Sequence, residues 1–174
     1  MSEAAAKLMG QADRARRENR LADARRDLVE AVALCRQAGK QRELVQALKR
    51  LGHVEQDLGN GDAARSLYEE AVSICREDGD PLRLAHTIRH LGDIHQDAGR
   101  LELAEPCYHE ALALYRSQAR TPSLELANVI RPLAILKDAA GKHEEAKRLW
   151  EEARELYSAA NVPEGVAECS ARLA

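Results

Sequence analysis

Hydrophobic residues recur every three or four positions along most of the chain, which is the spacing of an amphipathic α-helix. Between residues 43 and 58 this pattern predicts one helix, and Ala64, Tyr68 and Ala71 lie on the apolar stripe of a second. Glycine at Gly59, between the two segments, favours a tight turn. We therefore predict a helical hairpin whose first helix directs these residues inward: Leu44, Ala47, Leu48, Leu51 and Leu58.

The same hairpin pattern returns further along the chain. Leu51 recurs one period later as Leu91, and after a slightly longer interval as Leu133. The stripe of the second helix recurs as Ala104, Tyr108 and Ala111, then as Ala146, Trp150 and Ala153, with a weaker early copy at Ala24, Leu28 and Ala31. A regular period of this kind indicates stacked helical repeats, an architecture that offers a long binding surface and requires no reaction centre.

These intervals predict one all-α array over residues 1–174. Its helix-turn-helix repeats cover about 3–39, 43–79, 82–119 and 122–160, and a capping helix over 163–174 covers the last apolar face. We expect Asp62 to be the N-cap of the second helix in the second repeat. Asp80-Pro81 and Thr121-Pro122 predict the starts of the next two repeats, because the first residue caps a helix and proline suits its first position.

Small residues mark the places where the two helices of a hairpin cross. Gly52, Gly92 and Ala134 occupy equivalent positions, where a larger side chain would hold the helices apart. We expect Ala64, Ala104 and Ala146 to meet them from the second helix. The aromatic residues Tyr68, Tyr108 and Trp150 are expected to fill the gap toward the next repeat.

Composition narrows the class of protein further. Aromatic residues make up 3% of the chain and the net charge is -3, which argues against general attraction to nucleic acid. We find no signal-peptide core and no run of about 18 apolar residues, so we expect no membrane partner. Cys35, Cys75, Cys107 and Cys169 form no CxxC pair, which favours reduced thiols and a cytoplasmic location.

The repeated residues resemble the tetratricopeptide repeat (TPR) family. The family pattern appears as Leu48, Leu51, Gly52, Ala64, Tyr68 and Ala71, and again in the next two repeats. The period exceeds the usual length of about 34 residues, which is similar to the long-repeat, kinesin-light-chain variety. An aromatic position of the family holds Glu55, His95 and Lys137 instead. The resemblance implies a right-handed superhelix, an α-α solenoid.

In this family the first helix of each pair lines a concave groove that binds a partner. Carried over position by position, the resemblance predicts these groove residues: Gln46, Lys49, Arg50, His53, Gln56, His86, Arg89, His90, Asp93, Gln96, Asn128, Arg131 and Asp138. The sequence has no serine-histidine-acid arrangement, glycine-rich phosphate loop or paired-carboxylate signature beyond what the repeats explain, so we expect no catalytic residue and no cofactor.

The charges among and beside these residues form two rows. The basic row contains Lys49, Arg50, Arg89, His90 and Arg131, and the acidic row contains Asp57, Asp97 and Asp138. Carboxylates near the C-terminal end of a helix oppose its dipole, so we expect arginines of a neighbouring repeat or a bound cation to offset them. Such a groove would orient a peptide or helix with an acidic edge. The alternative is that these charges serve solubility.

Three functions are compatible with the sequence. The leading hypothesis is a non-catalytic scaffold or adaptor that binds a peptide segment or helix. The second is a regulatory module that senses a peptide or metabolite and changes its superhelical shape. The third is a metal-dependent or enzymatic role at His86, His90 and Asp93, since histidines four residues apart on a helix permit a metal site. Self-association through the ends or the convex side is compatible with all three.

Overall fold

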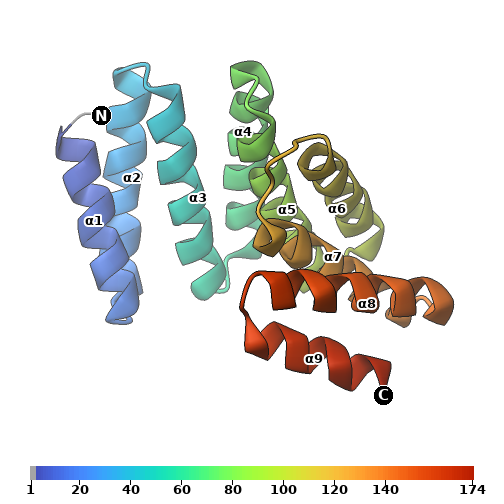
Figure 1. Cartoon of the computed structure of the whole chain (residues 1–174). Coiled ribbons are helices and arrows are strands. Elements are labelled where there is room, and N and C mark those ends of the chain that lie inside the picture. Colours follow the sequence, from blue (N-terminus) through green and yellow to red (C-terminus); the bar gives the residue numbers. More distant parts are fainter. Residues whose placement is uncertain (1–2) are drawn as a thin grey trace. The chain divides into compact units, whose positions relative to one another are not determined.

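The computed structural model describes residues 3–174, and these residues form nine α-helices and no strand (Figure 1). The helices are α1 (Glu3–Arg17), α2 (Leu21–Gln37), α3 (Gln41–Asp57), α4 (Gly61–Asp78), α5 (Pro81–Asp97), α6 (Leu101–Arg116), α7 (Ser123–Ala139), α8 (His143–Ala159) and α9 (Pro163–Leu173). This arrangement confirms the predicted all-α fold of helix-turn-helix repeats.

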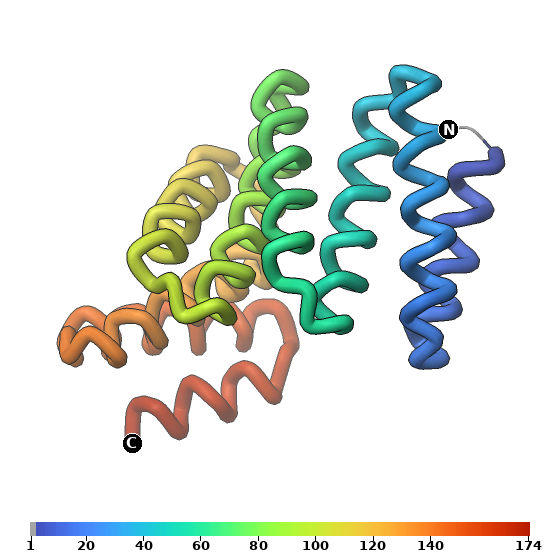
Figure 2. Tube along the Cα trace, turned by 180° about the vertical axis from the view of Figure 1, so that it is seen from behind, coloured from blue at the N-terminus to red at the C-terminus, as the bar shows by residue number. Residues whose placement is uncertain are grey.

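The helices belong to two compact units. The first ends at Asp80 and contains α1 to α4, and the second begins at Pro81 and contains α5 to α9. Within each unit, successive helices pack side by side, as the chain trace in Figure 2 shows for α1 with α2 and for α8 with α9. Each unit therefore contains two complete hairpins, and α9 adds a single helix to the second.

The hairpin turns use a backbone conformation that favours glycine. Gly59 follows α3 with a φ of 80°, and the next residue, Asn60, donates its backbone N–H to the carbonyl of Glu55 at 2.8 Å. This hydrogen bond ends the helix, because it pairs a carbonyl group of the last turn that would otherwise have no partner. The first hairpin places Asn19 at the equivalent position with a φ of 57°, which asparagine tolerates better than most residues.

Three details of the predicted helix ends and faces are wrong. The residue before α4 is Asn60 and the helix starts at Gly61, so Asp62 lies inside the first turn rather than at the N-cap. Helix α7 starts at Ser123, and the Thr121 hydroxyl instead donates to the carbonyl of Tyr115 at 2.6 Å. Leu58 is 37% exposed because α3 ends at Asp57, one residue before it.

In the hairpins α3–α4 and α5–α6, the core is an aromatic ring packed on a glycine, which has no side chain. A Cβ atom added to Gly52 would lie 2.5 Å from Cε2 of Tyr68, and one added to Gly92 would lie 2.7 Å from Cε1 of Tyr108. Both tyrosines are fully buried. The aromatic residue thus packs against the small residue of its own hairpin, whereas the sequence pattern predicts an alanine at that contact.

Two charged residues are buried where the family pattern has an aromatic one. Glu55 of α3 accepts hydrogen bonds from Arg25 of α2 at 2.6 Å and from Asn60 at 2.7 Å. Lys137 of α7 is 8% exposed and contacts Glu105 of α6 at 2.6 Å. In both units, therefore, a buried charge on the first helix of one hairpin is paired with the second helix of the preceding hairpin.

Replacing either crossing glycine with alanine is expected to destabilise the protein. Gly52→Ala and Gly92→Ala place a methyl group against a buried ring, and overpacking of this kind typically costs about 1–3 kcal/mol. Gly10→Ala is the matched control, because a Cβ added there meets no atom within 4 Å and alanine favours a helix by up to about 1 kcal/mol. Urea unfolding of the three variants measures the difference, and equal stability of all three would contradict this packing.

Candidate functional site

In the first unit, the predicted groove residues lie along α3. Gln46, Lys49, Arg50, His53 and Gln56 are all exposed or half-buried there. Two ion pairs join this helix to α1: Arg50 lies 3.7 Å from Asp13, and Arg16 contacts Asp57 through two bonds of 2.5 and 3.2 Å. As expected, the negative charge of Asp57 is therefore balanced by an arginine of a neighbouring repeat, Arg16.

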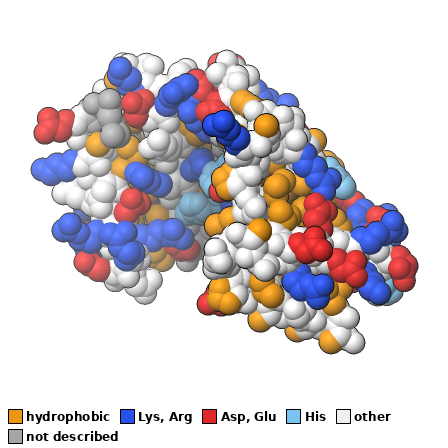
Figure 3. Space-filling model, viewed as in Figure 1, with side chains coloured by type: hydrophobic (Ala, Val, Ile, Leu, Met, Phe, Trp, Pro, Cys, Tyr) orange, Lys and Arg blue, Asp and Glu red, His pale blue; other side chains and the backbone are white. Residues whose placement is uncertain are grey.

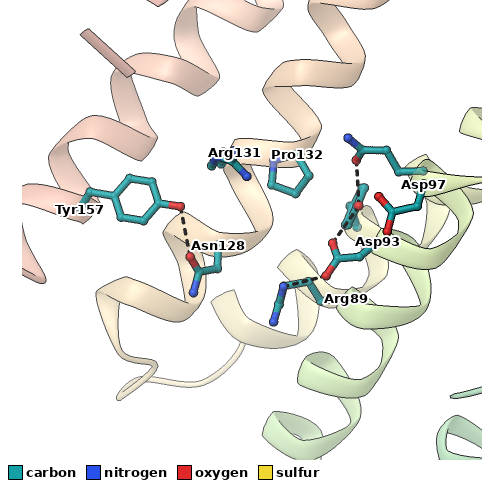
Figure 4. Close-up of a pocket in the computed structure, with 9 residues that line it drawn as sticks. Arg89, Asp93, Asp97, Asn128, Arg131, Pro132 and Tyr157 are labelled. Carbon is teal, nitrogen blue, oxygen red and sulfur yellow. Dashed lines mark hydrogen bonds and ion pairs between the residues drawn. The ribbon is translucent and has the colours of Figure 1, made fainter. Parts of the chain in front are cut away.

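In the second unit, helices α5 and α7 enclose a polar pocket of about 250 Å³ (Figure 4). We call it the α5–α7 pocket, and its lining consists of Arg89, Asp93, Gln96, Asp97, Asn128, Arg131, Pro132, Tyr108 and Tyr157. Five of the predicted groove residues meet in it, namely Arg89, Asp93, Gln96, Asn128 and Arg131. His86, His90 and Asp138 lie outside this lining.

Arg89, His90 and Asp93 form a connected cluster on α5. Arg89 donates through Nη1 to Asp93 Oδ2 at 2.9 Å and through Nη2 to His90 Nε2 at 2.8 Å. An accepting Nε2 requires the ring proton on Nδ1, which lies 3.3 Å from Asp93 Oδ2. Burial lowers the pKa of His90 to about 4, despite the opposing effect of Asp93, so this imidazole is neutral at pH 7.

The hydroxyl and indole tips of the core aromatics end on groove residues. The Tyr108 hydroxyl lies 2.9 Å from both Asp93 Oδ1 and Gln96 Oε1. In the first unit, the Tyr68 hydroxyl lies 3.0 Å from His53 Nε2. Burial of the Asp93 carboxyl would raise its pKa, but hydrogen bonds and the nearby Arg89 charge outweigh burial and lower it. Asp93 is therefore a carboxylate fixed by both the groove and the core.

Asp138 does not belong to the acidic row in which the sequence placed it. Counted from the matched leucines Leu91 and Leu133, it is equivalent to Gln96 rather than to Asp97. Its carboxylate accepts a 2.7 Å hydrogen bond from Trp150 Nε1, just as Gln96 accepts one from Tyr108 of its own hairpin. Asp138 therefore holds the aromatic core residue of its own hairpin.

The far side of the α5–α7 pocket is fixed by partners on α8 and α9. Asn128 accepts a hydrogen bond of 3.1 Å from the Tyr157 hydroxyl of α8. Arg131 makes a two-pronged ion pair with Glu168 of α9, with Nε to Oε2 and Nη2 to Oε1 both at 2.8 Å. The Arg131 guanidinium lowers the pKa of Glu168, which keeps this carboxyl ionised.

His86 and His90 are neighbours, but they face different partners. Their rings meet edge to face with 4.7 Å between centroids, while His86 Nδ1 lies 3.5 Å from Glu125 Oε2 of α7. Glu125 also accepts a 3.0 Å hydrogen bond from the Tyr115 hydroxyl. Within residues 3–174 no group of three histidine, cysteine or acidic side chains is arranged to hold a metal ion.

Sequence reasoning missed Tyr157, which lines the α5–α7 pocket, and two carboxylates that pair with predicted groove residues, Glu125 with His86 and Glu168 with Arg131. Glu168 could have been found from the period, because it lies as far from the start of α9 as Asn128 lies from the start of α7. It therefore occupies the groove position of α9. Tyr157 and Glu125 gave no such signal, since neither lies at a groove position of the predicted repeats.

The charged groups near the groove are largely paired within each unit. On the face of the molecule shown in Figure 3, basic and acidic side chains are interspersed rather than gathered by sign. Among the side chains described, Arg50, Arg89 and Arg131 of the predicted basic row each contact a carboxylate. Each of these three arginine charges is therefore offset by a carboxylate within its own unit.

The tetratricopeptide repeat family model matches residues 43–117 and 83–159, and the matched hairpins carry the small residues and aromatics described above. The chain belongs to the tetratricopeptide repeat family. Members of this family generally act as non-catalytic scaffolds for protein interaction. A search of curated protein sequences finds no match to this chain.

Three solved structures are similar to this TPR chain. BtubC (BKLC) from P. vanneervenii has 22% identity and a TM-score of 0.76, covering 95% of this chain and 76% of that one. A putative kinesin light chain with TPR-like repeats from Podospora anserina has 16% identity and a TM-score of 0.75, covering 99% and 95%. Aspartyl phosphate phosphatase F from Bacillus subtilis has 14% identity and a TM-score of 0.87, covering 98% and 45%. At these identities the likeness shows the fold.

Two further observations concern the described helices and the cysteines. None of the described helices has both the length and the hydropathy needed to span a membrane. The cysteines are free thiols, and Cys35 and Cys75 are buried at equivalent positions of α2 and α4. Burial raises the pKa of the Cys35 thiol, which makes it less reactive.

Replacing His90 with glutamine is expected to flatten the pH dependence of stability between about pH 6.5 and 4. The unfolded chain binds a proton at an ordinary imidazole pKa of about 6.5, whereas the folded protein binds it at about 4. Stability conferred by the neutral His90 is therefore lost as pH falls through this window, by at most about 1.4 kcal/mol per pH unit. Urea unfolding at stepped pH measures the slope, and parallel profiles for wild type and His90→Gln would contradict the assignment.

Proposed function

We propose that this TPR chain is a non-catalytic scaffold or adaptor that holds a peptide segment or helix of a protein partner against its first helices. The observation that carries this proposal is the α5–α7 pocket. It brings together five residues at groove positions, on two successive first helices, around a space of about 250 Å³. A polar space of this size suits one or two residues of an extended chain better than a large cofactor.

The lining chemistry matches a peptide. A peptide main chain offers one donor and one acceptor per residue, and both must be paired when it is buried. Asn128 accepts from Tyr157 through its carbonyl oxygen, which leaves its amide N–H groups to donate to a ligand carbonyl. Asp97 and Gln96 supply acceptors at the opposite wall. We infer that such hydrogen bonds would fix the position of a bound peptide along the groove.

Charge would then select among partners. Arg131 and Arg89 line the same pocket as Asp93 and Asp97, so a bound segment meets both signs within a short distance. Groups arranged in this way favour a partner of complementary charge order and reject others, more than they raise affinity. An acidic edge facing Arg131 is the complement that we propose for the partner.

Replacing Asn128 with alanine is expected to weaken the binding of groove peptides about fivefold, which corresponds to roughly one neutral hydrogen bond of about 1 kcal/mol. Peptides would be selected on the wild-type protein from a random library displayed on phage, and their dissociation constants measured by fluorescence anisotropy. Gln118→Ala is the matched control, because it also removes an amide but lies between α6 and α7, outside the pocket lining.

Equal affinity of wild type, Asn128→Ala and Arg131→Gln for the selected peptides would reject the pocket as the binding site. Thermal melting of each variant separates lost binding from lost folding. Small-angle scattering with and without the peptide addresses the alternative function, since a sensor that changes superhelical shape would show a large change in its radius of gyration. A scaffold would keep the same radius apart from the peptide itself.

A further inference from the structure

The two arginines of the α5–α7 pocket differ in how freely they could meet a ligand. The Arg89 side chain is 13% exposed and is held by Asp93 and His90 on its own helix. The Arg131 side chain is 40% exposed, and its guanidinium bonds to a carboxylate from a different helix, Glu168 of α9. Arg131 is therefore the cation that a partner could reach with the least rearrangement.

Glu168 occupies the position that a ligand carboxylate would take. It lies at the groove position of α9, equivalent to that of Asn128 on α7, and its two oxygens meet the Arg131 Nε and Nη2 atoms side by side. Paired contacts of this kind are the preferred geometry of any carboxylate on an arginine. An aspartate or glutamate from another chain would make the same two hydrogen bonds.

We propose that Arg131 is the point where the pocket binds a carboxylate of the partner, and that Glu168 holds this place in the unbound protein. This inference rests on the proposed function, because it assumes that a peptide enters the α5–α7 pocket. Binding then exchanges one carboxylate for another on Arg131, so that the arginine keeps its hydrogen bonds throughout. Glu168 acts as an internal competitor that sets the affinity for acidic segments.

The energetics allow such an exchange. The Arg131–Glu168 pair is partly exposed, at 40% and 35% of its two side chains. Ion pairs with this exposure typically change an equilibrium by at most about fivefold, because solvent screens them and both side chains lose freedom. A partner that adds contacts elsewhere in the pocket can therefore displace Glu168.

The exchange also leaves α9 in place. A Cβ added to Gly165 would lie 2.5 Å from Cγ of Tyr157, which shows how closely α9 packs on α8. Arg172 of α9 lies 5.6 Å above the Trp150 ring, which adds a cation–π contact to the same helix pair. Rotation of the Glu168 side chain alone is enough to free Arg131.

The test compares two glutamate-to-glutamine variants of α9 that change the charge equally. Glu168→Gln removes the competitor, whereas Glu164→Gln alters an exposed residue of the same helix. The probe is a fluorescein-labelled peptide in which glutamate alternates with glycine and serine, beside a counterpart with glutamine in place of glutamate. Fluorescence anisotropy at low salt gives the dissociation constants with the chain of residues 1–174.

We expect Glu168→Gln to bind the acidic peptide about two- to fivefold more tightly than Glu164→Gln does, with no such gain for the glutamine peptide. In an Arg131→Gln background the gain should disappear, because there is no longer a cation to compete for. Equal affinity of Glu168→Gln and Glu164→Gln would overturn the inference. So would a gain that persists without Arg131.

The experiment separates this inference from the proposed function. Peptides selected on the wild type that depend on Asn128 but not on Glu168 or Arg131 would leave the scaffold function standing and reject the exchange. If no selected or designed peptide binds any variant, both proposals fall together.

Discussion

The contact on which the rest of the structure depends is an aromatic ring lying against a glycine of the paired helix. Because Gly52 and Gly92 have no side chain, the two helices of a hairpin approach closely enough for Tyr68 and Tyr108 to be fully buried between them. The close approach fixes how each first helix is rotated. That rotation decides which of its residues are left on the outer face, so the surface that we propose for binding follows from the core packing.

The same rings link the core to the groove directly. Tyr68, Tyr108 and Trp150 each direct a polar atom to a residue at a groove position, respectively His53, the Asp93 and Gln96 pair, and Asp138. These residues satisfy buried polar atoms, which would be costly to leave unpaired. Part of the predicted groove therefore serves stability, and fewer residues remain for the recognition that we propose. In the second unit, that proposal centres on Asn128 and Arg131.

The sequence predicted the helices and their pairing well, because period and apolar spacing report directly on local structure. Five of the residues in the α5–α7 pocket were predicted from the resemblance to the family, carried over position by position. The errors of the sequence prediction occur where a shift of one or two residues in the repeat interval changes which positions are equivalent. The interval from Leu91 to Leu133 is longer than the one from Leu51 to Leu91, and this shift placed Asp138 in the wrong row. Ion-pair partners such as Glu168 could not be read from one helix, because they come from helices that meet only in the folded chain.

Two ion pairs, each with one buried charge, affect which repeats pack against one another during folding. Glu55 accepts from Arg25 in the first unit, whereas in the second the sign is reversed and Lys137 contacts Glu105. Similar hairpins in one chain can stack in the wrong order during folding, since their apolar faces are nearly interchangeable. Exchange of α3 and α7 would set the buried Glu55 against Glu105 and the buried Lys137 against Arg25, so that each buried charge would meet a like charge. The opposite charge order of the two ion pairs thus makes each interface specific for its own helix, which the apolar residues alone do not do.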